Sequence, residues 1–256
     1  MAWDPAQYEL FQAARARPGH DLIAALPPLR PRHVADLGCG TGGLTRRLAE
    51  QYPDAEVMGL DSSPAMLAKA GATPGRVAWS LGDIAHWHAP GPMDLVFSNA
   101  ALHWLEDHAA LFPRLMRTLA PGGVLAVQMP RNFASPSHAL IRRVAAEGPW
   151  AERLAPALRE APVHEPAAYH RWLAPHAAHV DVWETEYLHL LDGADPVLEW
   201  TRGTALLPVQ ETLEPAEFAE FLARYRDLLR AAYPPERDGR TLFPFRRLFI
   251  VARARG

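Results

Sequence analysis

The chain has 256 residues, of which 49% are apolar and 21% charged, and this composition excludes a disordered tail or a fibrous repeat. The 26 basic side chains nearly balance the 29 acidic ones, which excludes the strongly basic surface of a nucleic-acid-binding domain. Cys39 is the single cysteine and cannot form a disulfide within the chain. Because apolar runs stay shorter than the roughly 18 residues of a membrane span, we expect a cytoplasmic protein without a membrane or nucleic-acid partner.

The first half of the chain alternates short β-like runs with helical patterns. We expect strands at residues 33–37, 56–60, 76–81, 93–98 and 124–129, and helices at 44–51, 64–70 and 107–119. This alternation predicts right-handed βαβ units in an α/β fold: a doubly wound, Rossmann-like and mostly parallel sheet with helices on both faces. Ligands of such folds bind at the carboxyl ends of the strands where the strand order reverses.

The second half is richer in helical patterns. We expect helices at 137–147, 151–160, 196–206 and 215–233, and strands at 179–191 and 247–253. The two late strands are expected to join the edge of the sheet, one of them antiparallel, while the helices form a cap. The prediction is a single domain over 1–256, with a helical N-terminal lid at 1–30, a cofactor-binding core at 31–130, and cap segments with the last strands at 131–256.

A glycine-rich loop follows the first expected strand. Gly38, Gly40 and Gly43 satisfy the GxGxxG pattern that is typical of NAD and FAD sites. Asp36 precedes the first glycine by two residues, and a carboxylate there is unfavourable beside a pyrophosphate but favourable beside a cation. S-adenosylmethionine carries an amine and a sulfonium and no phosphate, so the loop favours this cofactor over a dinucleotide.

Two more acidic residues stand at strand ends. Asp61 closes the second strand, where a carboxylate can accept hydrogen bonds from ribose hydroxyls. Asp83 follows the third strand beside Ile84, a pair that suits the amino group and the ring of adenine. Either carboxylate taken alone is equally well explained as a helix or turn cap. The set as a whole predicts a nucleoside site.

These motifs resemble the class I S-adenosylmethionine-dependent methyltransferases over residues 31–129. The resemblance implies that the glycine loop faces the methionine part of the cofactor and that the turn after the fourth strand flanks the transferred methyl. The implied cofactor-binding residues are Asp36, Gly38, Gly40, Asp61, Ser62, Met66, Asp83, Ile84, Asn99, His103 and Trp104. For His103 and Trp104, packing in the core is an alternative interpretation.

Segments outside this core resemble the bacterial trans-aconitate 2-methyltransferases, among them residues 3–8, 127–133, 199–204 and 243–253. The resemblance implies methyl transfer from S-adenosylmethionine to one carboxylate of trans-aconitate, giving a monomethyl ester and S-adenosylhomocysteine. A carboxylate is already ionised at neutral pH, so we expect a positioning mechanism with no general base. We also expect no metal, because the twelve histidines lack convergent acidic or cysteine partners.

A small trianion as substrate makes the arginines informative, because a guanidinium binds a carboxylate through two parallel hydrogen bonds. The candidate substrate-binding residues are Tyr8, Arg17, Arg131, Trp200 and Arg202. The chain has 25 arginines and one lysine, and this excess is a compositional habit that does not by itself argue for an anionic substrate. The segment 3–17 is expected to close over the site and exclude water.

Three alternatives stay open at this point. The first is an enzyme of the same fold that methylates another small acid, a malonyl-carrier-protein carboxyl group or a quinone. The second is a non-catalytic S-adenosylmethionine-binding protein, which would not need the cap arginines. The third is a Rossmann oxidoreductase. The sequence leaves open which carboxylate is methylated and the oligomeric state.

Overall fold

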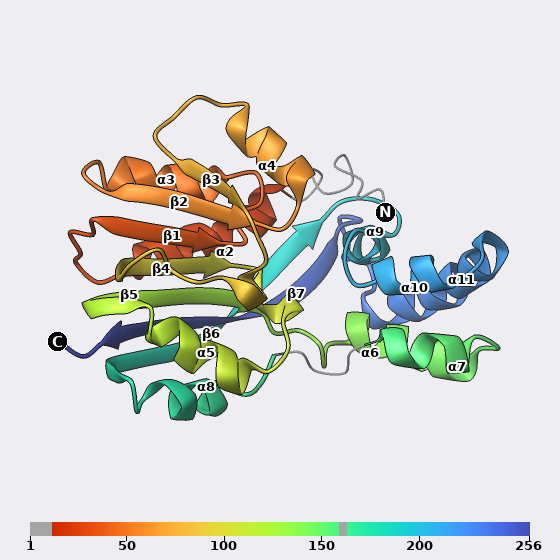
Figure 1. Ribbon diagram of the computed structural model, residues 1–256. Coiled ribbons are helices and arrows are strands. Elements are labelled where there is room, and N and C mark those ends of the chain that lie inside the picture. Colours follow the sequence, from red (N-terminus) through yellow and green to blue (C-terminus); the bar gives the residue numbers. More distant parts are fainter. Residues whose placement is uncertain (1–11, 159–162) are drawn as a thin grey trace. The chain divides into compact units, whose positions relative to one another are not determined.

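The computed structural model describes residues 12–158 and 163–256 (Figure 1), so the predicted substrate residue Tyr8 lies outside the described residues. Two compact units emerge from the contacts between residues. The sheet unit contains residues 16–130, 163–185 and 247–256. The helical unit contains, among the described residues, 12–15, 131–158 and 186–246.

Seven strands form one sheet in the order β3-β2-β1-β4-β5-β7-β6. Their bounds are β1 His33–Leu37, β2 Glu56–Asp61, β3 Ala78–Leu81, β4 Met93–Asn99, β5 Leu119–Pro130, β6 Ala177–Leu191 and β7 Thr241–Ala254. Strands β1 to β5 pair in parallel, and β7 runs antiparallel to β5. This confirms the predicted doubly wound, mostly parallel sheet with a late antiparallel strand. Because β1 lies between β2 and β4, the strand order reverses at β1.

The helices in the first half follow the predicted pattern with shifted ends. The helical elements are α2 Gln12–Ala24, α3 Gly43–Gln51, α4 Pro64–Gly71, η1 Ile84–His86, η2 Leu102–Trp104, α5 His108–Met116, α6 Pro136–Glu147, α7 Ala151–Leu154, η3 Ala155–Ala157, α8 Pro166–Leu173, α9 Pro196–Arg202, α10 Leu207–Thr212 and α11 Pro215–Ala232. Helix α5 ends before its predicted bound because Leu119 already belongs to β5. The predicted end of the helix over 196–206 is wrong. Helix α9 ends at Arg202, and α10 begins separately at Leu207.

Helix α8 is an element that sequence reasoning missed. It lies beside α5 in the sheet unit (Figure 1), and its Tyr169 is fully buried. The Tyr169 hydroxyl and the His108 Nδ1 are 2.7 Å apart, while the His108 Nε2 lies 2.9 Å from the carbonyl oxygen of Leu102. Phe112 packs edge-on against Tyr169 at 4.8 Å between ring centroids. This aromatic cluster fixes η2, which follows the turn at the end of β4.

The strands at the centre of the sheet are buried on both sides. Leu95, Val96 and Phe97 of β4 are fully buried, as are residues 124–127 of β5. Continuous apolar runs of this kind are typical of parallel strands that are covered on both faces. Polar side chains are therefore concentrated where these strands end, and that edge carries the candidate site.

The helical unit has its own core, formed mainly by α6, α9, α10 and α11 with the ends of β6 and β7. Trp150, Phe221 and Phe243 are fully buried in it. The buried Tyr225 hydroxyl donates to the carbonyl oxygen of Ser137 at 2.7 Å, which ties α11 to the start of α6. No helix within residues 12–158 and 163–256 combines the length and apolarity needed to cross a membrane.

Candidate active site

The glycine loop leaves the carboxyl end of β1 in a left-handed conformation. Gly38, Gly40 and Gly42 have φ values of 79°, 54° and 77°, which glycine adopts without a steric penalty. A Cβ on Gly38 would lie 2.2 Å from the Cβ of Ala101 in the turn after β4, so the loop packs closely against that turn. A Cβ on Gly40 would meet no described atom within 4 Å. Gly38 thus serves packing, whereas Gly40 borders open space that a ligand can fill.

Asp61 holds the loop from the end of β2. Its Oδ2 accepts from the backbone N–H of Gly40 at 2.8 Å, and its Oδ1 accepts from that of Ser63 at 2.9 Å. The side chain is partly exposed, and each carboxylate oxygen can accept a further hydrogen bond. Asp61 therefore connects the glycine loop to the start of α4 and keeps acceptor capacity for a hydroxyl-bearing ligand. Its neighbour Ser62 is exposed.

Asp36 is the buried acid of the site, with 2% of its surface exposed. Its Oδ2 accepts from the Thr45 hydroxyl at 2.6 Å. Burial raises the pKa of Asp36 to about 7, the Thr45 hydrogen bond opposes that rise, and the nearby Asp61 carboxylate adds to it. A cationic ligand close to this carboxyl group would favour its ionised form. Burial and the same two carboxylates also raise the pKa of the Cys39 thiol, which keeps it protonated.

The turn after β3 carries Asp83 and Ile84. Asp83 is exposed and caps the turn, because its Oδ1 accepts from the backbone N–H of Ala85 at 2.8 Å. Ile84 is largely buried. Arg114 of α5 donates to the carbonyl oxygens of Trp87 at 2.7 Å and Ile84 at 2.8 Å, and thereby fixes this turn to the helix. Asp83 therefore acts as a cap, as the alternative interpretation of the sequence expected. Its other carboxylate oxygen, Oδ2, lies 3.3 Å from the Nδ1 of His86.

Met66 lies one turn into α4 and is partly exposed. The helix begins after Ser63, whose hydroxyl accepts from the backbone N–H of Met66 at 3.4 Å. This cap and the Asp61 contact with Ser63 together place the first turn of α4 beside the glycine loop. The predicted ribose and adenine residues therefore stand at the ends of β2 and β3.

The turn after β4 contains the residues predicted to flank the reacting methyl. Ala100 has a φ of 52°, and its backbone N–H donates to the carbonyl oxygen of Gln128 at 2.9 Å. Asn99, just before it, is partly exposed. His103 is 8% exposed and Trp104 59% exposed, with their rings 4.7 Å apart. Trp104 is therefore not a core aromatic, whereas a packing role is compatible with the burial of His103.

Gln128 is a polar residue at this edge that sequence reasoning missed. It is fully buried in β5. Neither its amide nitrogen nor its amide oxygen has a hydrogen-bond partner among the described residues. The signal was present in the sequence, because Gln128 is the one polar residue in the apolar run 124–129.

Because β1 to β5 are parallel, their carboxyl ends meet at one edge of the sheet. The sheet unit thus gathers a buried acid, a loop of left-handed glycines, two acids at strand ends and an amide at the end of β4. Such an edge can hold a nucleoside that bears a cation. Across the parts of the chain that the structure describes, no cluster of three or more His, Cys, Asp or Glu side chains could hold a metal ion.

The predicted substrate residues are divided between the two units. Arg17 lies on α2, is strongly exposed and forms an ion pair with Asp21 at 3.7 Å. Arg131 is the first residue of the segment 131–158 of the helical unit, and its backbone N–H donates to the carbonyl oxygen of Arg246 at 2.9 Å. Trp200, 3% exposed, is a core residue of the helical unit that stacks on His189 at 4.9 Å.

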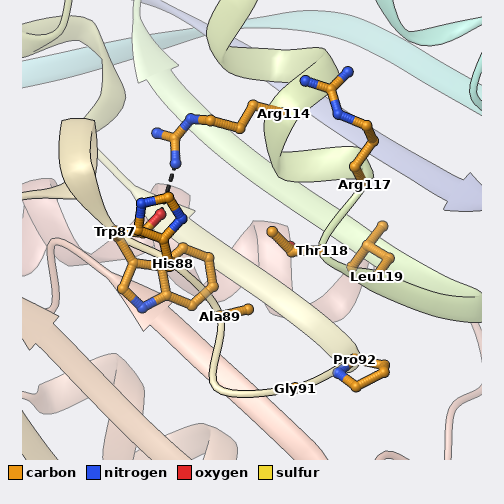
Figure 2. Close-up of a pocket in the computed structure, with 9 residues that line it drawn as sticks. All are labelled: Trp87, His88, Ala89, Gly91, Pro92, Arg114, Arg117, Thr118 and Leu119. Atoms are coloured by element: carbon orange, nitrogen blue, oxygen red, sulfur yellow. Dashed lines mark hydrogen bonds between the residues drawn. The ribbon is translucent and has the colours of Figure 1, made fainter.

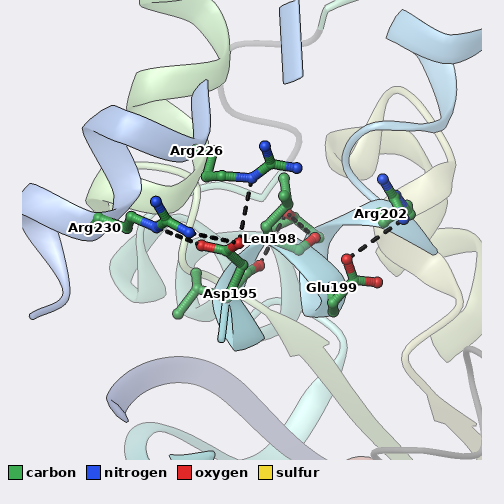
Figure 3. A network of polar contacts seen from close by, with 8 residues as sticks. Asp195, Leu198, Glu199, Arg202, Arg226 and Arg230 are labelled. Carbon is green, nitrogen blue, oxygen red and sulfur yellow. Dashed lines mark hydrogen bonds and ion pairs between the residues drawn. The ribbon is translucent and has the colours of Figure 1, made fainter. Parts of the chain in front are cut away.

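Arg202 is distinguished from neighbouring arginines by its partner (Figure 3). It pairs with Glu199 on the same helix at 3.4 Å, and both side chains are 37% exposed. Asp195 instead accepts two hydrogen bonds from the Arg230 guanidinium, at 2.7 and 3.0 Å. It also forms an ion pair with Arg226 at 3.3 Å. An exposed pair on one helix contributes only about 0–1 kcal/mol, so a ligand can recruit Arg202 at little cost.

A cavity of about 330 Å³ lies elsewhere in the sheet unit (Figure 2). It is lined by Trp87, His88, Ala89, Gly91, Pro92, Arg114, Arg117, Thr118 and Leu119. These residues precede β4 or lie just before and at the start of β5, so the cavity is at the amino ends of these strands, away from the edge that carries Asp36 and Asn99. It is not part of the candidate site.

Comparisons with known proteins agree with this geometry. A family profile described as "Methyltransferase domain" matches residues 34–123. The chain is 50% identical to a trans-aconitate 2-methyltransferase of Methylobacterium radiotolerans and 48% identical to one of Azoarcus sp. (strain BH72), in each case over 98% of both chains.

Among solved structures, the chain is similar to Haemonchus contortus phosphoethanolamine N-methyltransferase 2, determined with phosphomonomethylethanolamine and S-adenosylhomocysteine. The TM-score is 0.57 and the identity 17%, over 94% of this chain and 53% of that one. This similarity shows the fold alone, whereas the identity to the curated relatives over nearly their whole length shows the family. The chain belongs to the trans-aconitate 2-methyltransferase family of the class I methyltransferases.

Proposed function

We propose that the protein transfers the methyl group of S-adenosylmethionine to one carboxylate of trans-aconitate, giving a monomethyl ester and S-adenosylhomocysteine. The observation that carries this proposal is the 50% identity to a trans-aconitate 2-methyltransferase over 98% of both chains. The edge of the sheet unit at the carboxyl ends of β1 to β4 supports it independently, because its residues have the chemistry that this cofactor requires.

The residues at this edge fit the cofactor in four respects. Gly40 borders open space, the Asp61 carboxylate has acceptor capacity left for ribose hydroxyls, and Asp36 is a buried acid whose ionisation a cation would favour. Ile84 offers an apolar surface at the end of β3 for the adenine ring. When bound, the cofactor supplies an electrophilic methyl group on a sulfonium. Asp36, Gly38, Gly40, Asp61, Ser62, Met66, Asp83, Ile84, Asn99, His103 and Trp104 are proposed to contact it.

The proposed reaction needs no general base. A carboxylate oxygen of the acid forms the new O–CH₃ bond as the S–CH₃ bond breaks, and the bonding electron pair stays on sulfur. Carboxylates with ordinary pKa values near 4 are ionised at neutral pH, so no proton is removed. The protein contributes by holding the acid in line with the methyl group and by excluding water.

Arg17, Arg131 and Arg202 are proposed to bind the carboxylates of the trianion, with Tyr8 and Trp200 as positioning groups. The weak pairing of Arg202 with Glu199 supports its assignment, since an anionic ligand can compete with that single carboxylate. The stacking of buried Trp200 on His189 indicates that Trp200 acts by holding α9, and with it Arg202, in place.

The test is methyl transfer from labelled cofactor to a panel of acids: trans-aconitate, cis-aconitate, isocitrate, citrate and two monocarboxylates. We expect kcat/KM to be at least tenfold higher for trans-aconitate than for the monocarboxylates, and NMR of the product identifies the esterified carboxylate. Equal rates for monocarboxylates and trans-aconitate would contradict the proposal. Transfer to a malonyl carrier protein or a quinone instead would assign the chain another acceptor.

The domain organisation and location are also part of the proposal. Residues 1–30 are proposed to act as a lid on a single catalytic domain. A variant lacking only residues 1–11, which leaves α2 and its buried Leu22 in place, should retain S-adenosylhomocysteine binding but lose transfer. The reaction is proposed to take place in the cytoplasm, which fractionation of cells that express the tagged protein would test.

A further inference from the structure

Gln128 has an unmet hydrogen-bonding requirement at the edge of the sheet that carries the site. Its side chain is fully buried near the carboxyl end of β5, and both amide atoms are without a partner within the described residues. A buried polar group left unsatisfied costs about 1–3 kcal/mol, so a ligand or a water that bonds to it is strongly favoured.

Asn99 shares this feature on the neighbouring strand. Asn99 and Gln128 are register partners in the parallel pair β4–β5, so their side chains emerge from the same face of the sheet, on strands about 4.8 Å apart. The Asn99 Oδ1 is likewise buried and has no hydrogen-bond partner in the parts of the chain that the structure describes. The bond from the Ala100 N–H to the Gln128 carbonyl oxygen keeps the two residues in this register.

On this face of the sheet, Asn99 lies against α2. A Cβ built on Gly19 of α2 would lie 3.2 Å from the Asn99 Cγ, so the Asn99 side chain points toward this helix. Gln128 is one strand farther from the glycine loop than Asn99, because the sheet runs β1-β4-β5. A group that binds to Gln128 therefore lies one strand farther from the glycine loop than a group that binds to Asn99.

The polarity of the orphaned atoms restricts what can satisfy them. Asn99 Oδ1 and Gln128 Oε1 accept, whereas Gln128 Nε2 donates. Trans-aconitate offers only acceptors, and the methionine part of the cofactor offers an ammonium donor and a carboxylate acceptor, the latter a competitor that the S-adenosylhomocysteine affinity of the variants tests. One arrangement would satisfy all of the orphaned atoms: the ammonium would donate to Asn99 Oδ1, Asn99 Nδ2 would donate to Gln128 Oε1, and Gln128 Nε2 would donate to a substrate carboxylate.

We propose that Gln128 is a substrate-binding residue whose amide, oriented by Asn99, donates a hydrogen bond to a carboxylate of the acid. This inference rests on the proposed function and adds to it a residue outside the arginine set. It also links the two ligands, because the cofactor orients the amide that receives the acid. The alternative occupant of the site is a structural water that bonds both amides.

The experiment measures binding without turnover, by calorimetry of trans-aconitate against protein with and without S-adenosylhomocysteine. Gln128→Leu removes the donor and Gln128→Glu replaces it with an acceptor of the same shape, while Gln51→Glu is the control because it changes an exposed amide on α3. In the S-adenosylhomocysteine complex we expect about a tenfold loss of trans-aconitate affinity for Gln128→Leu, a larger loss for Gln128→Glu, and none for Gln51→Glu.

Two further readouts separate the explanations. Affinity for S-adenosylhomocysteine should change less than about threefold in both Gln128 variants, and the melting temperature of Gln128→Leu should equal or exceed that of the wild type. Unchanged trans-aconitate affinity, a matching loss of S-adenosylhomocysteine affinity, or a lower melting temperature for Gln128→Leu would each overturn the inference. A wild-type protein that does not bind trans-aconitate at all would overturn the proposed function itself.

Discussion

The hydroxyl of Thr45, in the first turn of α3, donates a 2.6 Å hydrogen bond to the buried carboxyl group of Asp36 at the end of β1. This hydrogen bond lowers the pKa of Asp36 by less than burial raises it, so the pKa is still about 7. The folded state therefore binds this proton more tightly than the unfolded chain, whose carboxyl pKa is about 4. Asp36 therefore contributes to the free energy of unfolding below pH 4, and this contribution is lost as the pH rises through 7.

Replacing Asp36 with Asn should make the protein more stable and less able to bind its cofactor. The neutral amide avoids burial of a charge, so the free energy of unfolding at pH 8 should rise by about 1–4 kcal/mol. The loss of stability with rising pH between 4 and 7 that ionisation of Asp36 causes should disappear in this variant. Affinity for S-adenosylhomocysteine should fall at least tenfold, because the ammonium loses its carboxylate. Urea denaturation at several pH values and calorimetry provide the two measurements, and an Asn variant that binds as tightly as the wild type would contradict the role of Asp36.

Gly38 and Gly40 should respond differently to alanine, although both have a positive φ. The methyl group of Gly38→Ala would lie 2.2 Å from the Ala101 Cβ, so this variant should lose about 3 kcal/mol of stability or more. Gly40→Ala meets open space and should lose only about 1 kcal/mol from its left-handed backbone. Its methyl group would occupy the open space beside the loop where the cofactor is proposed to bind, and it should reduce S-adenosylhomocysteine affinity more than tenfold.

Thermal denaturation and calorimetry of the two purified variants separate these effects. A Gly40→Ala variant that binds S-adenosylhomocysteine normally would show that the open space beside the loop does not receive the cofactor.

The sheet was predictable from the sequence because its strands are short apolar runs separated by clear turn residues. The glycine loop and the acids at the strand ends were predictable for the same reason, since parallel strands bring their carboxyl ends together. Helix α8 was missed because its buried face depends on Tyr169, whose hydroxyl is satisfied by His108, 61 residues away in the chain. Gln128 was missed because a single polar residue in an apolar strand becomes informative only when its burial and its lack of partners are known.

Arg202 should matter for the affinity of the acid and little for stability. Arg202→Met should raise the KM for trans-aconitate at least tenfold while kcat changes less than about threefold, because the lost contact holds a carboxylate that does not react. Arg202→Lys should recover part of this loss through its charge. Glu199→Gln removes the competing carboxylate at 3.4 Å and should leave KM unchanged or lower it.

Arg230→Met is the matched control, because Asp195 already engages Arg230 through two nitrogens. It should lower the melting temperature slightly and leave the KM for trans-aconitate unchanged. If Arg202→Met and Arg230→Met affected KM equally, the effect would be one of general charge, and Arg202 would not be a specific contact.

His138 gives the helical unit a dependence on pH of the opposite sign. Burial and the nearby Arg142 guanidinium lower the pKa of His138 to about 4, below its ordinary value of 6.5. Its Nδ1 lies 3.2 Å from the Ser137 hydroxyl and 3.4 Å from the Asn132 amide nitrogen, contacts that suit a neutral ring. The folded state binds fewer protons than the unfolded chain, so this contribution is present above pH 6.5 and is lost as the pH falls through 4.

Between pH 4 and 6.5 the contributions of Asp36 and His138 to stability therefore partly cancel, and the wild-type curve should be flatter than that of either single variant. His138→Asn should remove the loss at acid pH, so that its stability rises steadily as the pH is lowered from 7 toward 4 because only the Asp36 contribution remains. Amide hydrogen exchange at pH 5 assigns the effects, since His138→Asn should change protection first in α6 and Asp36→Asn first in β1 and α3. A wild-type curve steeper than both variants would contradict the opposite signs of the two groups.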